Sequence, residues 1–195
     1  AQYDSRMTDP DFVPRVLREV MADGLLVNFQ TNAPPQMAKL IEQHQIPSVW
    51  LNTKRTFDAV YLDDFDALQR LTAHFLERGH RRIAYVDESF GTATQHYSKV
   101  DRHAGYLAAM QAAGLEPDTL LLGSGQTRGE LAREFLQWLD RGDRPDVVLT
   151  YSGGEVQLFL IAVLPALGLH TPQDLLLGTV GYAADFAPVP VTKLA

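Results

Sequence analysis

Three aspartates, Asp63, Asp64 and Asp66, stand close together directly after a short apolar run. A cluster of carboxylates could bind a hard cation such as Ca²⁺ or Mg²⁺. The same residues are also common where a helix begins, because a carboxylate there accepts hydrogen bonds from free N–H groups and matches the helix dipole. We favour the second interpretation, in which Asp63 ends a strand and Asp64 or Asp66 caps the helix that follows.

No other group of residues has the spacing of a catalytic or metal-binding motif. The histidines at positions 74, 80, 96 and 103 do not fit a zinc site or an HExxH motif, and the chain has no cysteine. Cysteine nucleophiles, thiolate zinc sites and disulfides are therefore excluded. The sequence also lacks a GxSxG elbow, a Walker loop and a GxGxxG loop, and the Gly-Ser-Gly at 123–125 is too short to bind phosphate. We predict a protein that is not an enzyme and that uses neither a metal nor a cofactor.

The composition is that of a soluble globular protein. The chain has 195 residues, of which 46% are hydrophobic, and 24 acidic residues against 17 basic ones give a net charge of −7. This length allows one large domain or two small ones. An acidic chain is a poor ligand for nucleic acid, because contact with phosphates needs a basic surface. No apolar run approaches the roughly 20 residues of a membrane span, so we predict no membrane partner. No signal peptide is visible, but the first residues already read as the middle of a domain, so this absence carries little weight.

Short apolar runs alternate with longer amphipathic segments along almost the whole chain. The pattern predicts strands at 25–27, 48–51, 59–62, 83–86, 120–122, 147–149 and 175–180. It predicts helices at 9–22, 35–44, 66–78, 101–113, 129–139 and 155–167, the last bent or shortened by Pro165. This alternation is typical of parallel βαβ units, and therefore of one or two doubly wound α/β sheets. Such sheets bind ligands beyond the carboxyl ends of their strands, which directs attention to 28–31, 52–54, 87–90, 123–126, 151–155 and 182–185.

Four sequence blocks then occur in a recognisable order. They are Gly-His-Arg-Arg-Ile-Ala at 79–84, Arg-His-Ala-Gly-Tyr at 102–106, Pro-Asp-Val-Val at 145–148, and a Gly-Leu…Pro-Gln-Asp-Leu…Val-Gly-Tyr pattern over 168–182. Together with the preceding segment from Val60, they resemble the effector-binding core of the lactose/galactose-repressor (LacI/GalR) family. The similarity extends over essentially the whole chain.

The resemblance implies a two-lobed fold like that of periplasmic sugar-binding proteins, with parallel doubly wound sheets, helices on both faces and an effector held between the lobes. Residues 1–62 would form part of the first lobe and residues 63–195 the second lobe. The family has a helix-turn-helix DNA-binding domain before the region that matches Ala1, and it returns to the first lobe after the region that matches Ala195. The chain is therefore expected to be a core truncated at both ends, without the DNA-binding domain.

The resemblance also indicates residues that would contact the effector. Arg102 matches the family's effector-binding arginine, and its guanidinium offers five donors for sugar hydroxyls or a carboxylate; a surface arginine that caps local backbone is the alternative. Ser98 matches a second contact position, although a helix cap is slightly favoured. Asn28 ends a strand where the family places a polar contact, and an asparagine that orders a turn is the alternative. Asn52 ends the next strand, where some sugar-binding members carry an aspartate; the amide keeps the acceptor and removes the charge, so altered polar binding is expected.

Two departures from the family pattern concern the same site. A polar pair that ends in aspartate usually opens the penultimate helix, and Ser-Gly-Gly-Glu stands here at 152–155. Gly153 and Glu155 are then the candidates, with Glu155 replacing the acid after a shift of one residue, unless the contact is lost. The final Gly-Tyr-Asp string reads Gly-Tyr-Ala at 181–183, so Tyr182 remains and the aspartate is missing. Because two acceptors for sugar hydroxyls are absent, we expect a non-standard effector, weak sugar binding or a site that no longer responds to ligand.

The predicted function is that of the effector-sensing, dimerising core of a transcriptional repressor. It would be cytoplasmic, bind a sugar or sugar derivative, form a homodimer, and reach operator DNA through a domain outside this chain. The alternative is a transport-associated periplasmic sugar-binding protein, which would carry a secretory signal and act as a monomer. The residues upstream of Ala1 would distinguish the two, because a helix-turn-helix pattern and a signal peptide are easily told apart.

Overall fold

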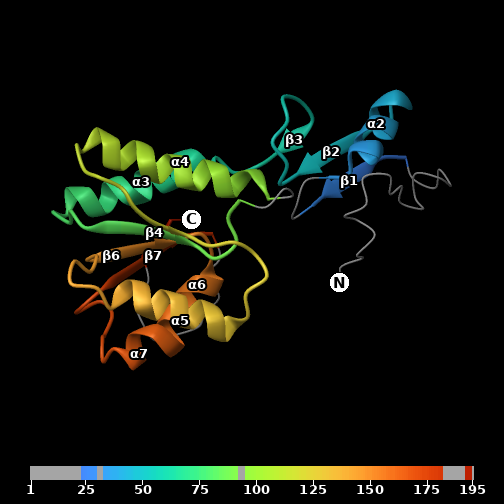
Figure 1. Cartoon of the computed structure of the whole chain (residues 1–195). Coiled ribbons are helices and arrows are strands. Elements are labelled where there is room, and N and C mark those ends of the chain that lie inside the picture. The colour runs from blue at the N-terminus through green and yellow to red at the C-terminus, as the bar shows by residue number, and fades with distance from the viewer. Residues whose placement is uncertain (1–22, 30–32, 92–94, 182–191, 195) are drawn as a thin grey trace. The chain divides into compact units, whose positions relative to one another are not determined.

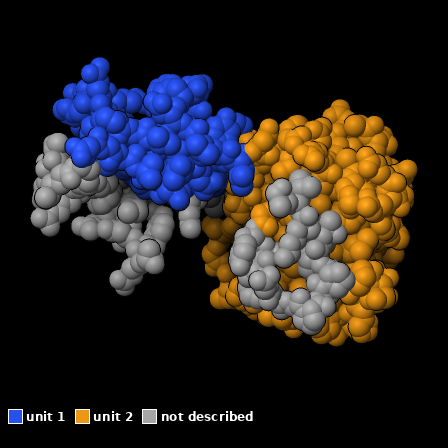
Figure 2. All heavy atoms as spheres, turned by 180° about the vertical axis from the view of Figure 1, so that it is seen from behind, with its two compact units in different colours: residues 1–62, 94–97 blue, residues 63–93, 98–195 orange. Residues whose placement is uncertain are grey.

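A computed structural model describes residues 23–29, 33–91 and 95–181 in full, and residues 192–194 by their backbone. The chain forms two compact units, which Figure 2 distinguishes by colour. Unit 1 contains residues 1–62 and 94–97, and unit 2 contains residues 63–93 and 98–195. The predicted helix at 9–22 and the candidate residue Tyr182 lie outside the described residues.

Unit 1 contains a small parallel sheet with one helix packed on it. Its strands are β1 (Leu25–Asn28), β2 (Ser48–Leu51) and β3 (Ala59–Val60), in that spatial order. The helix is α2 (Pro35–Gln43), and its Met37 and Ile41 pack against Val27 and Trp50 of the sheet. Leu26, on the opposite side of β1 from Val27, is 75% exposed. Side-chain alternation along the strand explains this contrast between neighbours.

Unit 2 contains a five-stranded parallel sheet, in the order β5-β4-β6-β7-β8. The strands are β4 (Ile83–Asp87), β5 (Asp118–Leu121), β6 (Val147–Thr150), β7 (Leu176–Val180) and β8 (Thr192–Leu194). Every residue of β4 and β6 is buried. A parallel sheet covered on both faces needs such continuous apolar strands, and the predicted α/β class with parallel sheets is confirmed.

Helices cover both faces of this sheet (Figure 1). On one face lie α3 (Asp64–Glu77) and α4 (Tyr97–Ala112). On the other lie α5 (Arg128–Leu139) and α6 (Gly153–Leu158), which runs on through a π-helical turn at Phe159–Val163 into α7 (Leu164–Ala166). The predicted helix at 155–167 is therefore interrupted next to Pro165, whose missing N–H disturbs the regular α-helical hydrogen bonds.

The strand order contains one reversal of direction. From β4 the chain crosses to β5 at one edge of the sheet, and from β5 it returns past β4 to β6. The connection that leaves β4 therefore runs toward one edge of the sheet, and the connection that leaves β6 runs toward the other edge. The space beyond the carboxyl ends of these two strands is the topological switch point. Ligands of doubly wound sheets bind at such a point.

Among the residues that the structure describes, no helix has both the length and the apolar character that crossing a membrane requires.

Gly105 allows α3 and α4 to approach closely, and this contact can be tested. A Cβ atom at Gly105 would lie 2.2 Å from the backbone oxygen of Phe65, whereas one at Gly129 of α5 would meet nothing within 4 Å. We expect Gly105→Ala to lower the free energy of unfolding by about 2–3 kcal/mol, because the obstructing atom is backbone and cannot move aside. Gly129→Ala, the matched control, should leave it unchanged or raise it by up to about 1 kcal/mol. Urea unfolding measures both, and equal effects would contradict this account of the contact.

Candidate functional site

Polar side chains gather at the switch point between β4 and β6. Asp87 ends β4, and Tyr151 directly follows β6. The first turns of α4 supply Ser98, Lys99 and Arg102, all of which are buried. Burying polar groups lowers the stability of the fold unless the groups pair with one another. The contacts of each group therefore show which hydrogen-bonding atoms are left to bind a ligand.

Arg102 holds four segments of unit 2 together. Its Nε atom lies 2.6 Å from Asp64 Oδ1, and the Asp64 residue is only 1% exposed. Its Nη1 atom donates to the backbone carbonyl of Val180 at 3.0 Å and also to that of Tyr151. The guanidinium therefore links α4 to the first residue of α3 and to the ends of β6 and β7. The other terminal nitrogen, Nη2, has no hydrogen-bond partner among the described residues, and it faces Gly181, where a Cβ atom would lie 3.9 Å away.

Tyr151 is fixed by contacts to three side chains of α4. Its hydroxyl shares a hydrogen bond of 2.9 Å with Ser98 Oγ. Lys99 Nζ lies 3.8 Å from the centre of its ring, and the guanidinium carbon of Arg102 lies 4.9 Å from it. Cations near an aromatic face are attracted to its π electrons, particularly where water is excluded. Tyr151 is partly exposed, and these contacts restrict the rotation of its ring. A ring that is both accessible and fixed is suited to stacking against a ligand.

A second buried ion pair lies beside the first. Lys99 Nζ contacts Asp87 Oδ1 at 2.6 Å, and the Asp87 side chain is fully buried. Its second oxygen, Oδ2, has no hydrogen-bond partner among the described residues, and the same holds for Tyr85 Oη and His103 Nε2. Tyr85 and Asp87 share one face of β4, and the His103 ring stacks on Tyr85 with centroids 5.6 Å apart. Burial lowers the pKa of His103 and raises that of Tyr85, so both side chains are neutral at pH 7.

The loop after β6 leads into α6 through a capping box. Ser152 is the N-cap, and its backbone N–H donates to Glu155 Oε2 at 2.9 Å. The Ser152 hydroxyl contacts the same oxygen, and the N–H of Glu88 donates to Glu155 Oε1 at 3.4 Å. Glu155 is fully buried, and this burial raises the pKa of its carboxyl to about 7, while the hydrogen bond from Ser152 opposes the shift. Nearby Glu88 and Asp87 raise this pKa further because their negative charges disfavour a third.

Arg128, the first residue of α5, links the loop after β4 to the first turn of α6. It donates to Glu88 Oε2 at 3.0 Å and to the carbonyl oxygen of Gly154 at 2.9 Å. Its side chain is half exposed, so this ion pair contributes little to stability, although it neutralises the charge of Glu88.

The two predicted asparagines belong to unit 1. Asn28 ends β1 and is exposed. Asn52 follows β2 in a left-handed backbone conformation with φ of 57°, which asparagine tolerates better than most residues. Its N–H donates to the carbonyl of Val60 at 2.8 Å, and its carbonyl oxygen contacts His96 Nε2 at 2.7 Å. Both contacts are made by the backbone of Asn52: the first continues the pairing of β2 with β3, and the second reaches a histidine distant in sequence.

The structure brings four predicted site residues, Ser98, Arg102, Gly153 and Glu155, to the carboxyl edge of one sheet. Two expectations about caps were wrong. Asp63 caps α3 by accepting from the N–H of Asp66 at 3.0 Å, whereas Asp64 is the buried partner of Arg102. Ser98 lies inside α4 and contacts Tyr151 instead of capping the helix. Both errors arise because the helices begin earlier than the apolar pattern predicts.

Sequence reasoning missed the roles of Lys99 and Asp87 as a buried pair. The signal for Asp87 was present, since it opens one of the strand-end loops selected by the rule for doubly wound sheets. Lys99 had no signal, because a lysine near a helix start is normally exposed. Among the described residues, no three acidic or histidine side chains are placed to hold a metal ion.

Comparison with known proteins places this geometry in a family. The model of the periplasmic binding protein-like domain matches residues 72–195. The chain belongs to this family. The transcriptional regulator MalR of Staphylococcus xylosus is 27% identical over 178 residues, which are 88% of this chain and 50% of MalR. The chain spans half or less of the relatives to which it was matched.

Solved structures of the family have the same fold. A LacI-family regulatory protein from Chloroflexus aggregans matches 95% of this chain and 65% of its own, with a TM-score of 0.73 and 23% identity. The transcriptional regulator CelR in complex with cellobiose matches 92% of this chain and 56% of its own, with a TM-score of 0.70 and 25% identity. The predicted resemblance to LacI-family regulators is confirmed.

The Arg102–Asp64 pair provides a test of the site's architecture. Asp64→Asn leaves a permanently charged guanidinium buried without its counter-charge, so we expect it to lower the free energy of unfolding by about 3 kcal/mol. Asp63→Asn changes the adjacent residue in the same way, but asparagine is an equally good N-cap, and we expect a change within about 0.5 kcal/mol. Urea unfolding measures the free energy of unfolding of both variants. A similar decrease in the two would refute the assignment of Asp64 as the buried partner of Arg102.

The raised pKa of Glu155 predicts how stability depends on pH. A carboxyl whose pKa is about 7 in the folded state and 4.5 in the unfolded state favours folding below pH 4.5, and this contribution is lost as pH rises through 7. Relative to Glu155→Gln, the wild type should lose stability between pH 5 and pH 8, by an amount on the order of 3 kcal/mol. Thermal unfolding across this range measures the difference, and parallel curves for the two proteins would contradict the prediction.

Proposed function

We propose that this chain is the effector-binding part of a LacI-type transcriptional regulator, and that unit 2 holds a sugar-like ligand against Tyr151 and Arg102. The observation that carries the proposal is the fixed Tyr151 ring at the switch point, with Ser98, Lys99 and Arg102 around it. An aromatic surface beside charged donors suits a ligand that has both an apolar face and hydroxyl groups.

The polar groups of the site that have no hydrogen-bond partner among the described residues indicate which ligand atoms would fit. Arg102 keeps its Nη2 donors available, whereas both carboxylate oxygens of Glu155 already accept bonds from Ser152 and Glu88. Lys99 is paired with Asp87. Among the described residues, Arg102 Nη2 is thus a free charged donor at this edge, and Asp87 Oδ2 is a free acceptor. A sugar that carries a carboxylate or phosphate as well as hydroxyl groups would match both. Gly153 and Tyr182 remain proposed contacts of this site.

We assign unit 1 to the first lobe and unit 2 to the second lobe of the family's effector-binding core, with Asn28 and Asn52 as proposed effector contacts of the first lobe. Regulation would follow from a ligand that binds one conformation of the core more tightly than another and thereby shifts their populations. The acidic net charge of −7 agrees with a role in which a separate domain contacts operator DNA. We propose that the complete regulator is a cytoplasmic homodimer, because paired half-sites in DNA require two DNA-binding domains.

The direct test is a thermal-shift screen of the chain with cellobiose, other mono- and disaccharides, sugar acids and sugar phosphates. A ligand that binds the native state raises the unfolding temperature, and at one hundred times Kd it stabilises by about 2.7 kcal/mol. We expect a shift with at least one probe that is retained in Tyr151→Phe, which keeps the ring, and lost in Tyr151→Ala.

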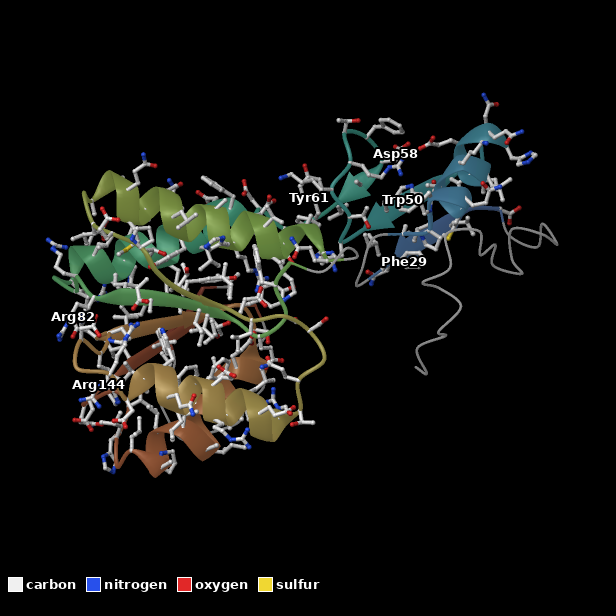
Figure 3. All side chains as sticks on the ribbon, viewed as in Figure 1. Phe29, Trp50, Asp58, Tyr61, Arg82 and Arg144 are labelled. Atoms are coloured by element: carbon white, nitrogen blue, oxygen red, sulfur yellow. The ribbon has the colours of Figure 1, made fainter. Side chains whose placement is uncertain are left out.

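Arg82→Ala is the matched control for this screen. Arg82 precedes β4 at the amino edge of the sheet, and Figure 3 labels it at that end of unit 2 together with Arg144. Its side chain is 61% exposed and pairs with Asp146 at the surface. This variant should bind like the wild type. A shift that survives Tyr151→Ala would place the ligand elsewhere, and no shift with any probe would contradict the proposed ligand class.

A further inference from the structure

Two helices of unit 2 begin with the same motif, yet their glutamates behave in opposite ways. In α5, Thr127 and Glu130 form a capping box, and in α6 Ser152 and Glu155 form another. Glu130 is exposed, and the hydrogen bonds from Thr127 lower its pKa. Glu155 is fully buried, and its pKa is raised. The local motif is therefore the same, and the surroundings determine the charge.

The contacts of Glu155 reach beyond its own helix. Oε2 accepts from the N–H and the hydroxyl of Ser152, which lies in the loop after β6. Oε1 accepts from the N–H of Glu88, which lies in the loop after β4. Tyr151 opens the loop after β6, and the loop after β4 begins directly after Asp87, so one carboxyl joins the two strand ends that form the candidate site.

The charged groups around Glu155 are already paired with one another. From β4 and the loop after it come Tyr85, Asp87 and Glu88, and from the loop after β6 comes Tyr151. On α4, Lys99 pairs with Asp87 and Arg102 with Asp64, while His103 is kept neutral by burial. On α5, Arg128 pairs with Glu88. Among the described residues, Glu155 has no cation of its own, so its charge is stabilised by hydrogen bonds alone and opposed by two neighbouring carboxylates.

We propose that Glu155 acts as a proton-operated tie between the two loops of the candidate site. As a carboxylate it accepts hydrogen bonds from both loops. When it takes up a proton, one oxygen becomes a donor and an acceptor position is lost. The contact to the Glu88 N–H is the longest of its backbone contacts, at 3.4 Å against 2.9 Å for Ser152, so it is the one that is released. The position of the loop after β4, which begins next to the Asp87–Lys99 pair, then depends on pH.

The test is an NMR titration of the ligand-free 195-residue chain from pH 5.5 to 8.5. The backbone amides of Glu88 and Ser152 and the side-chain carboxyl carbon of Glu155 are followed together. We expect all three signals to change with one shared midpoint near pH 7. Hydrogen exchange at the Glu88 amide, corrected for its intrinsic pH dependence, should be at least about tenfold faster below the midpoint than above it.

Two glutamine variants separate the tie from other causes. Glu155→Gln keeps a side chain that capping boxes accept, and it should abolish the transition at both amides. Glu130→Gln alters the matching box in α5 and should leave both curves as in the wild type. A transition that persists in Glu155→Gln, separate midpoints for the two amides, or a Glu155 carboxyl carbon that does not titrate in this range would each overturn the proposal.

The link to effector binding rests on the proposed function, but this experiment uses no effector. A positive titration with no ligand in the thermal-shift screen would retain the tie and reject the ligand class. A ligand found by the screen together with a flat titration would reject the tie and keep the binding site.

Discussion

The buried guanidinium of Arg102 is the constraint on which the edge of unit 2 depends. An arginine side chain keeps its charge at any physiological pH, so burying it requires an anion and acceptors for its remaining N–H groups. Asp64 supplies the anion, and the carbonyl groups of Tyr151 and Val180 supply acceptors at the ends of two strands. Those carbonyls lie at the ends of β6 and β7, so the guanidinium also gives hydrogen-bond partners to backbone groups at the edge of the sheet.

The position of Arg102 on α4 also determines where the neighbouring polar side chains lie. Lys99 lies almost one helical turn before Arg102 on α4 and therefore reaches the same sheet edge, where Asp87 ends β4. Tyr151 is then held between the two cations and Ser98. Buried ion pairs of this kind add little to stability in comparison with apolar packing. What they provide is a fixed arrangement of donors around one aromatic ring, which a binding site needs before the ligand arrives.

Much of the fold could be predicted from the sequence, because parallel strands covered on both faces leave a clear pattern. The apolar runs at 83–86 and 147–149 correspond to β4 and β6, and Gly79 and Gly114 follow the ends of their helices with the positive φ angles that this position favours. The helix starts were less predictable. At α3 and α4 the first turns carry polar residues, Asp64 and Lys99, that are buried only because they pair with residues distant in sequence.

The residues of the candidate site also fall into a group that the sequence predicted and a group that it did not. Arg102 and Ser98 were predicted as contacts through the resemblance of their segment, and Glu155 through its place at the start of the penultimate helix; the structure brings these three residues to one sheet edge. Their partners could not be predicted, because each partner depends on how the chain reverses between β5 and β6 and brings the loops after β4 and β6 together. The two capping boxes make the reason clear: Thr-x-x-Glu and Ser-x-x-Glu predict the same hydrogen bonds, and both form. Whether the glutamate is charged depends on the switch point beside it, since only there do a buried sheet edge and two further carboxylates surround the group. Sequence pattern therefore determines where an acid sits on its helix, and the topology of the sheet determines its chemistry.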